Sequence, residues 1–392
     1  MKSVLIVYGT MSIGGSTTSL LSLLQHFDRN KYEVDFALAS DKGELQFMLP
    51  EDLNILPALM PENLQQLKRK SLRSIMEYCK AKMYAKKSCN SKNVMGQIMS
   101  YENVRLSRSL TKKYDIAISF LENYPLVYVA NNVVADKKIT WIHVDYKAAG
   151  FIPRFDKKCF SKFDKIVLVS DECKKTFDSE FPELSEKSIV IENILTANTV
   201  NKLAEQSVDI KVSGENFNIV TVCRISFAHK GLDRVVNAFN KLKQQKIQHN
   251  LKWYVIGDGV DYNKMTQRVK EYNLGNTIFL LGAKERPLPY VKMMDVFLLP
   301  SRYEGKPMAV TEAQMLGIPP VVTNYASATG QINSGFDGLI VDNTDDAVYD
   351  ALCYLIGNQN EVRKWRNNLE RENFDNIQEI NKVYTIIEEK NE

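Results

Sequence analysis

Short apolar runs alternate with helical patterns along the whole chain. Residues 3–8 are almost wholly apolar, residues 16–27 follow with helical periodicity, and residues 33–39 form the next apolar run. Further runs in the first half lie at residues 115–120, 138–143 and 165–170. Apolar strands separated by helices are typical of a parallel sheet that is covered on both faces.

A second series of the same kind begins after a polar stretch at residues 191–200. It predicts strands at 217–223, 251–256, 277–281, 295–299, 319–323 and 338–341, and helices at 231–244, 261–273, 289–294 and 308–316. Open parallel sheets bind ligands beyond the carboxyl ends of their strands. The fold class is therefore predicted as α/β, with two Rossmann-like domains that face each other across a cleft.

The break between the two series sets the predicted domain boundaries. Residues 1–193 form the first domain and residues 194–372 the second. Residues 373–392 are helical and highly charged, and we expect this C-terminal helix to pack back toward the N-terminal domain.

The composition is ordinary for a soluble globular protein. Of the 392 residues, 44% are hydrophobic and 25% are charged, and no apolar stretch is long enough to cross a bilayer. The six cysteines are scattered without a C-x-x-C pair, and the four histidines are dispersed. Neither a disulfide framework nor a metal site is predicted. We expect a cytoplasmic protein that needs no metal or other cofactor.

The net charge of +4 conceals a strongly basic stretch. Residues 62–113 hold thirteen Lys or Arg and only three acids, and part of this stretch has the pattern of a basic amphipathic helix. Such a surface could lie on anionic lipid at the inner face of the cell membrane. The alternative is a solvated helical face beside a loop. Nucleic-acid binding is disfavoured because no recognition motif accompanies the charge.

Residues 298–313 carry the densest chemical signal. The sequence LLPSRYEGKPMAVTEA predicts a strand that ends at Pro300, a polar loop containing Gly305, and a helix that begins near Pro307. Backbone N–H groups of Lys306, Met308 and Ala309 would then lie at a helix N-terminus, where a diphosphate binds readily.

Two carboxylates flank this loop. Glu304 and Glu312 are separated by seven residues, so they should address different parts of one ligand. Carboxylates suit sugar hydroxyls because charge-assisted hydrogen bonds are strong. The alternative makes Glu312 a solvated helix residue and Glu304 an acid favoured by the helix dipole.

A pair of cations follows the first strand of the second series. Arg224 and Lys230 could reach one point and neutralise a diphosphate leaving group. No Asp-x-Asp pair, which commonly holds a metal against such a group, occurs in the chain. These cations would therefore do the work of the metal, unless they are ordinary surface residues.

These motifs together resemble the donor domain of glycosyltransferase family 4, which has the GT-B fold. The resemblance covers residues 217–345 and rests on TVCRISFAHKGLDRVVNAF, VIGDGVD, LLGAKERPLPYVKMMDVFLLPSRYEGKPMAVTEAQMLGIPPVVT and GFDGLIVDN. Members of this family are retaining, usually metal-independent enzymes that take the sugar from a nucleotide-sugar donor.

The resemblance implies a role for each matched residue. Glu304 would bind the hydroxyls of the donor sugar and Glu312 the ribose. Arg224 and Lys230 would hold the diphosphate, helped by backbone amides near Lys306, Met308 and Ala309. Gly282, Ala283 and Lys284 would border the base.

The N-terminal half resembles the family more loosely, as expected for the acceptor-binding domain. Gly14 and Gly15 resemble the family's glycine loop near the donor phosphates, and His143 resembles the histidine that reaches the donor sugar. With Glu304, His143 is the predicted catalytic residue. The alternative is a purely structural histidine.

The sequence is thus interpreted as a retaining transferase of a hexose or N-acetylhexosamine, from a nucleotide-sugar to a glycan or lipid-linked acceptor of a cell-surface polysaccharide. UDP-sugar is favoured only because it is common in the family. Two alternatives remain open: a nucleotide-sugar epimerase of the same architecture, and a non-catalytic donor-binding partner of another transferase.

Overall fold

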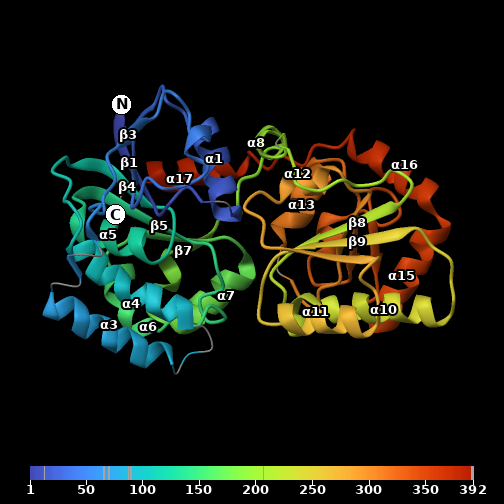
Figure 1. Cartoon of the computed structure of the whole chain (residues 1–392). Coiled ribbons are helices and arrows are strands. Elements are labelled where there is room, and N and C mark those ends of the chain that lie inside the picture. The colour runs from blue at the N-terminus through green and yellow to red at the C-terminus, as the bar shows by residue number, and fades with distance from the viewer. Residues whose placement is uncertain are drawn as a thin grey trace. The chain divides into compact units, whose positions relative to one another are not determined.

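The computed structural model describes residues 1–12, 14–64, 67–68, 71–86, 88, 91–205, 207–304 and 306–389. It divides the chain into two compact units (Figure 1). The first unit comprises Met1–Ile194 together with Asn376–Glu392, and the second comprises Leu195–Asp375. The prediction of two Rossmann-like domains of the α/β class is confirmed by the two parallel sheets.

The first unit is built on a seven-stranded parallel sheet in the order β3-β2-β1-β4-β5-β6-β7. The strands are β1 (Lys2–Tyr8), β2 (Tyr32–Leu38), β3 (Asn54–Leu56), β4 (Tyr114–Ser119), β5 (Ala135–Ile142), β6 (Lys165–Leu168) and β7 (Ser188–Val190). β1 pairs in parallel with both β2 and β4. The chain therefore reverses its direction of travel across the sheet between β1 and β4, and such a switch point is where open α/β sheets bind ligands.

Helices cover both faces of this sheet. They are α1 (Gly15–His26), α3 (Leu72–Ala85), α4 (Ser91–Arg105), α5 (Tyr124–Asn132), α6 (Pro153–Phe160), α7 (Asp171–Glu180) and α17 (Glu379–Glu388), with short 3-10 turns η1 (Gln46–Met48) and η2 (Pro182–Lys187). Residues of α5, α6 and α7 pack into one hydrophobic core. In Figure 1, α1 and α17 lie on the other side of the sheet.

The C-terminal helix α17 is part of the first unit. Its Tyr384 ring stacks on Tyr32 of β2, with centroids 5.8 Å apart and planes within 5°. The Tyr384 hydroxyl accepts a hydrogen bond from the Asp28 amide at 2.8 Å. Val383 and Ile386 are fully buried. An amphipathic helix from the end of the chain thus completes the core of the first unit.

The second unit holds a six-stranded parallel sheet in the order β10-β9-β8-β11-β12-β13. Its strands are β8 (Phe217–Val222), β9 (Leu251–Ile256), β10 (Ile278–Gly282), β11 (Val296–Leu299), β12 (Pro320–Thr323) and β13 (Leu339–Val341). β8 lies between β9 and β11, so the switch point of this sheet falls between β8 and β11. The loops that follow these two strands carry most of the predicted donor residues.

Two hydrophobic cores flank the second sheet. One contains residues of α10 (Leu232–Gln244), α11 (Tyr262–Glu271), α15 (Asp345–Gly357) and α16 (Gln359–Leu369). The other contains residues of α12 (Leu288–Lys292), α13 (Met308–Met315) and α14 (Ala328–Gln331). In Figure 1, α10 and α11 lie on one side of β8 and β9, and α12 and α13 lie on the other. The unit also contains α8 (Ala197–Leu203) and the short α9 (Phe227–Lys230).

Two segments differ in detail from the sequence prediction. The polar stretch at residues 191–200, which separates the two predicted series, contains the start of α8. The first turn of this helix is capped because the Thr196 hydroxyl accepts from the Thr199 amide. The basic stretch at residues 62–113 contains two helices, α3 and α4. In the part of the chain that the structure describes, no helix is long and apolar enough to cross a membrane.

Candidate donor site

Glu304 lies in the loop between β11 and α13, and its carboxylate is held by three side chains. Oε1 accepts hydrogen bonds from Lys230 Nζ and from Ser301 Oγ, each at 2.5 Å. His229 Nε2 lies 3.7 Å from Oε2. The Glu304 side chain is 8% exposed and that of Lys230 is 16% exposed. The structure therefore brings Glu304 and Lys230, predicted to serve one ligand, into direct contact.

The surroundings of Glu304 keep its carboxylate ionised. Burial acts to raise its pKa, but the hydrogen bond from His229, the charge of Lys230 and the hydrogen bonds from Lys230 and Ser301 outweigh burial and lower it. A carboxylate that stays charged while shielded from water is a strong acceptor for hydroxyl groups. Such a group suits a sugar.

Lys230 owes its position to the glycine that follows it. It is the last residue of α9, and Gly231 has φ of 65° before α10 begins at Leu232. A Cβ on Gly231 would lie 2.2 Å from the Pro300 carbonyl oxygen. Only glycine fits this left-handed conformation and this close approach. The loops after β8 and β11 are thus packed against each other at the switch point.

Arg224, unlike Lys230, has no side-chain partner among the residues that the structure describes. It lies just after β8, its side chain is exposed, and it forms no ion pair or hydrogen bond with the described residues. A guanidinium left in this state remains available to an anionic ligand.

An ion pair that the sequence prediction missed joins the same two loops. Both terminal nitrogens of Arg302 bind the Asp233 carboxylate at 2.9 Å, and the Arg302 amide donates to the His229 carbonyl at 2.8 Å. Asn343 donates to the Arg302 carbonyl at 2.7 Å. Bidentate pairing fixes the geometry of an arginine. The motif letters SRYEG and KGLD contain both residues, but nothing in their spacing indicates that they pair.

An aromatic stack lies beside Glu304. The His229 and Tyr303 rings are parallel within 6°, with centroids 4.1 Å apart. Tyr303 is exposed and His229 half-buried. The stack was also not foreseen, because a stacking partner is set by three-dimensional contact.

Glu312 is the second carboxylate of the motif, and its pKa is shifted in the opposite direction to that of Glu304. It lies on α13, keeps only partial exposure, and its carboxylate has no hydrogen bond or ion pair among the described residues. Burial raises its pKa to about 7. A desolvated carboxyl without a partner is destabilising unless a ligand supplies one. Glu312 therefore has the properties expected of a ligand-binding group.

The N-terminus of α13 lies in the same loop. The helix begins at Met308 after Pro307, so Met308 and Ala309 occupy its first turn and the exposed Lys306 precedes it. Gln331 fastens this end by donating to the Pro307 carbonyl at 3.3 Å and to Thr311 Oγ1 at 3.2 Å. First-turn N–H groups point away from the helix toward an incoming anion. Gly305, predicted to allow close approach of a ligand, lies outside the described residues.

The segment predicted to border the base follows β10. Gly282 ends the strand with φ of 70°, and Ala283 is exposed. The Lys284 ammonium is paired with Asp209 at 2.6 Å, which raises the pKa of Lys284. Tyr290 also donates to Asp209. The Lys284 side chain is thus already paired within the unit, and the partly exposed Gly282 and the exposed Ala283 are the residues left to border a base.

The predicted glycine loop of the first unit opens α1. Gly15 is the first residue of the helix, and the Thr17 and Thr18 amides both donate to the Gly14 carbonyl at 3.0 Å. The Tyr8 hydroxyl shares hydrogen bonds with Ser16 Oγ at 2.9 Å and Thr17 Oγ1 at 3.0 Å. Hydroxyl side chains therefore tie β1 to the helix start, at the switch point of this sheet.

His143 follows β5, and its pKa is strongly lowered in the folded protein. Both ring nitrogens are buried, although the residue as a whole keeps partial exposure. Burial lowers its pKa to about 4, opposed by hydrogen bonding to Asn193 and to the Phe120 backbone. His143 is therefore neutral at physiological pH, and in this state it does not act as a cationic acid.

A partly buried acid beside His143 was not foreseen. Glu122 follows β4, and its Oε2 accepts from the His143 amide at 3.3 Å. Burial raises the pKa of Glu122, against the effect of backbone hydrogen bonds. The next residue, Asn123, has φ of 64°, a conformation that residues with side chains adopt at a free-energy cost. Backbone strain of this kind gathers at ligand-binding positions, and it leaves no trace in the sequence.

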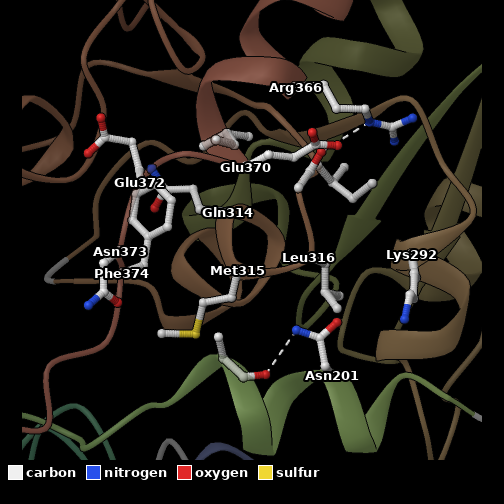
Figure 2. A pocket seen from close by; sticks show the side chains of 14 residues that line it. Asn201, Lys292, Gln314, Met315, Leu316, Arg366, Glu370, Glu372, Asn373 and Phe374 are labelled. Atoms are coloured by element: carbon white, nitrogen blue, oxygen red, sulfur yellow. Dashed lines mark hydrogen bonds between the residues drawn. The ribbon is translucent and has the colours of Figure 1, made fainter.

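A separate pocket of about 470 Å³ lies in the second unit, away from the predicted donor residues. Figure 2 shows it between α8, the C-terminal end of α13 and α16. Arg366 at its rim donates to the Gly317 carbonyl at 3.1 Å, so this cation is used to hold the end of α13. The pocket thus adjoins the opposite end of the helix whose N-terminus belongs to the candidate site.

Comparisons of sequence and fold with known proteins all identify glycosyltransferases as the similar class. Residues 204–372 match the model of the family described as glycosyl transferases group 1. The O-antigen biosynthesis glycosyltransferase WclY of Escherichia coli is 28% identical over 165 residues, which are 41% of this chain and 44% of WclY. The Escherichia coli UDP-Gal:alpha-D-GlcNAc-diphosphoundecaprenol alpha-1,3-galactosyltransferase is 34% identical over 100 residues, 25% of this chain and 26% of the enzyme. The matched stretches span less than half the length of these curated relatives.

The whole fold also has a solved counterpart. The crystal structure of Anabaena Alr3699/HepE in complex with UDP-glucose is similar over 99% of both chains, with a TM-score of 0.64 and 15% sequence identity. The protein therefore has the GT-B fold of glycosyltransferases, with two Rossmann-like units. Within it, nearly all of the second unit matches the group 1 glycosyl transferase model.

Proposed function

We propose that the protein is a glycosyltransferase that takes a hexose or N-acetylhexosamine from a nucleotide-sugar, with the donor bound by the second unit. The observation that carries this proposal is the ionised, buried Glu304 in contact with Lys230 at the β8/β11 switch point. A UDP-sugar is the favoured donor, because the related fold of Alr3699/HepE was solved with UDP-glucose.

Each part of the donor would meet a group of fitting chemistry. Glu304 would accept hydrogen bonds from sugar hydroxyls, and Oε2 is the better placed oxygen because Oε1 already has two donors. Glu312, whose carboxylate is unpaired within the described part of the chain, would accept from the ribose hydroxyls. Arg224, Lys230 and the first-turn amides of α13 would face the diphosphate.

This arrangement would assist departure of the leaving group. When the bond between the sugar C1 and the β-phosphate oxygen breaks, the nucleoside diphosphate takes the electron pair and gains negative charge. Fixed cations and helix N–H groups stabilise such charge without having to reorganise. We therefore propose that transfer is metal-independent, and that it proceeds with retention of the anomeric configuration, as the resemblance to family 4 implies.

The acceptor side rests on the first unit and on the relatives. We propose that the acceptor is a glycan or lipid-linked sugar of a cell-surface polysaccharide, since one relative is named for O-antigen biosynthesis and another for a diphosphoundecaprenol substrate. The protein would act in the cytoplasm at the inner face of the membrane. Gly15, Glu122 and His143 are the residues of this unit that we assign to the reaction.

Analysis of the reaction products tests the proposal. UDP-glucose, UDP-galactose and their N-acetylhexosamine counterparts are each incubated with the protein, with and without a lipid-linked acceptor extract. Released UDP and the sugar identity are then measured. A transferase releases UDP and moves the sugar to acceptor or water. An altered UDP-sugar without UDP release would instead establish an epimerase, and no change with any donor or acceptor would overturn the proposal.

A further inference from the structure

Helix α3 of the first unit buries small residues on its inner face and exposes large apolar residues on its outer face. Its inner face packs on α4, where Ser74, Ala81 and Ala85 are buried and the Ser74 hydroxyl donates to Glu102. Ala81 belongs to a small core with Val94 and Ile98 of α4. In Figure 1, α3 lies at the periphery of the unit with α4 beside it. A helix in this position normally turns polar residues outward.

The outward face of α3 is apolar instead. Leu72 is 81% exposed, Met76 70% and Met83 52%, and Ile75 is also exposed. At about 100° per residue, Leu72, Met76, Cys79 and Met83 fall within an arc of roughly 60°. The buried Ala81 and Ser74 lie on the opposite side of the helix by the same geometry. Tyr84 of the same helix packs inward against Phe155, with ring centroids 5.3 Å apart.

Cations border this apolar face on both sides. Arg73 and Lys80 lie on one flank and Lys82 and Lys86 on the other, roughly 40–100° from the centre of the stripe. The helix holds one acid, Glu77, which pairs with Lys80 at 3.1 Å. Arg73 is 70% exposed, and its Nε lies 3.9 Å from Glu102 Oε2, at the outer limit of an ion pair. Arg69 and Lys70 precede this helix but lie outside the described residues.

We propose that α3 binds in the plane of an anionic lipid bilayer, with Leu72, Met76 and Met83 inserted between the lipids and the flanking cations on the phosphates. Apolar insertion combined with basic flanks is how interfacial helices bind membranes. The charge of the helix indicates which surface it binds: lysine and arginine on both sides of an apolar stripe are complementary to a membrane with anionic headgroups. The inference goes beyond the proposed reaction and does not depend on it.

Vesicle flotation of the full chain tests this proposal. Vesicles of neutral phosphatidylcholine are compared with vesicles that also contain phosphatidylglycerol. We expect binding to the anionic vesicles, weakened about fivefold for each flanking base removed in Arg73→Gln and Lys82→Gln. Leu72→Asp/Met76→Asp should lower binding by more than tenfold. Both residues are exposed, so folding should be unaffected, which far-UV circular dichroism verifies.

A matched control separates α3 from any exposed apolar residue. Phe47 and Val134 lie in the same unit and are 66% and 61% exposed. Phe47→Asp/Val134→Asp should bind vesicles like the wild type. In Met76→Trp, tryptophan emission should shift to the blue on adding anionic vesicles, which reports insertion. No vesicle binding by the wild type, equal loss in both double variants, or self-association through α3 in place of lipid binding would each overturn the proposal.

Discussion

The Lys230 ammonium lies 2.5 Å from Glu304 Oε1, and both side chains are largely buried. The two residues are 74 positions apart in the sequence and follow adjacent strands, β8 and β11. Their contact joins the two loops of the switch point into one site. It also means that Lys230 helps to keep Glu304 ionised before any ligand is present.

Removing the cation should therefore destabilise the ligand-free protein. In Lys230→Met, the buried Glu304 loses its closest positive partner, and loss of one member of a buried pair costs about 3 kcal/mol. The pKa of Glu304 is lowered in the folded protein, so its stabilising effect exists above the usual carboxyl pKa and disappears as pH falls through the lower folded value. Urea unfolding at pH 7 should show the loss, and unfolding in acid should show little of it.

The double variant Lys230→Met/Glu304→Gln is the control for this prediction. It removes the uncompensated charge, so it should be more stable at pH 7 than Lys230→Met alone. Equal stability of the two variants would mean that the pair does not determine the charge state of Glu304.

Glu312 should show the opposite dependence on pH. Its folded pKa of about 7 lies above that of the unfolded chain, so the folded state holds the proton more tightly. The free energy of unfolding therefore falls as pH rises from the usual carboxyl pKa toward 7. We expect Glu312→Gln to raise Tm at pH 8 by a few degrees and to leave it nearly unchanged at pH 4.5. The same variant should weaken UDP binding, as expected where stability is sacrificed for ligand binding.

Thermal melts of Glu312→Gln and wild type at the two pH values check this expectation. A Tm difference that is equal at both would contradict the assigned ionisation of Glu312.

Gly231 should tolerate no side chain. An added Cβ meets the Pro300 carbonyl oxygen at 2.2 Å, and φ of 65° is unfavourable for other residues. Gly231→Ala should lower the free energy of unfolding by about 1–3 kcal/mol. It should also displace Lys230 from Glu304. Gly275→Ala is the matched control, because nothing lies within 4 Å of its added Cβ. Similar stability of both variants in urea titrations would refute this account of the loop.

His143 should contribute to kcat without changing its protonation state between pH 6.5 and 8. Its pKa of about 4 lies below that of the unfolded chain, so stability rises with pH between about 4 and 6.5 and His143 is neutral above this window. We expect His143→Gln to lower kcat while leaving the shape of the pH–rate profile between pH 6.5 and 8 unchanged. Disappearance of a titration from that profile in His143→Gln would show that the histidine is a proton-transfer group there.

The sequence predicts the two parallel sheets well because their strands are continuous apolar runs. Val4–Val7 in β1 and Val296–Leu299 in β11 are fully buried, as the runs indicated. The motif letters also identify Glu304 and Lys230, whose pairing depends only on two adjacent strand ends. For this part of the site, the local sequence pattern and the sheet topology together are sufficient to predict which residues meet.

The supporting contacts are not predictable in the same way. The Arg302–Asp233 pair and the His229–Tyr303 stack depend on how two loops fold over each other, which no residue spacing encodes. The outward apolar face of α3 shows the same limit. Its periodicity is visible in the sequence, but the face that α4 covers is decided by the small residues Ser74 and Ala81.

Isothermal titration of UDP into the wild-type protein, with EDTA present, tests the central claim most directly. The account predicts saturable binding without metal. Binding should weaken more than tenfold in Arg224→Ala, because this exposed arginine is unpaired among the described residues and can contact the diphosphate. Binding that requires a divalent metal, or wild-type affinity retained in Arg224→Ala, would contradict the assignment of the diphosphate site to the loops after β8 and β11.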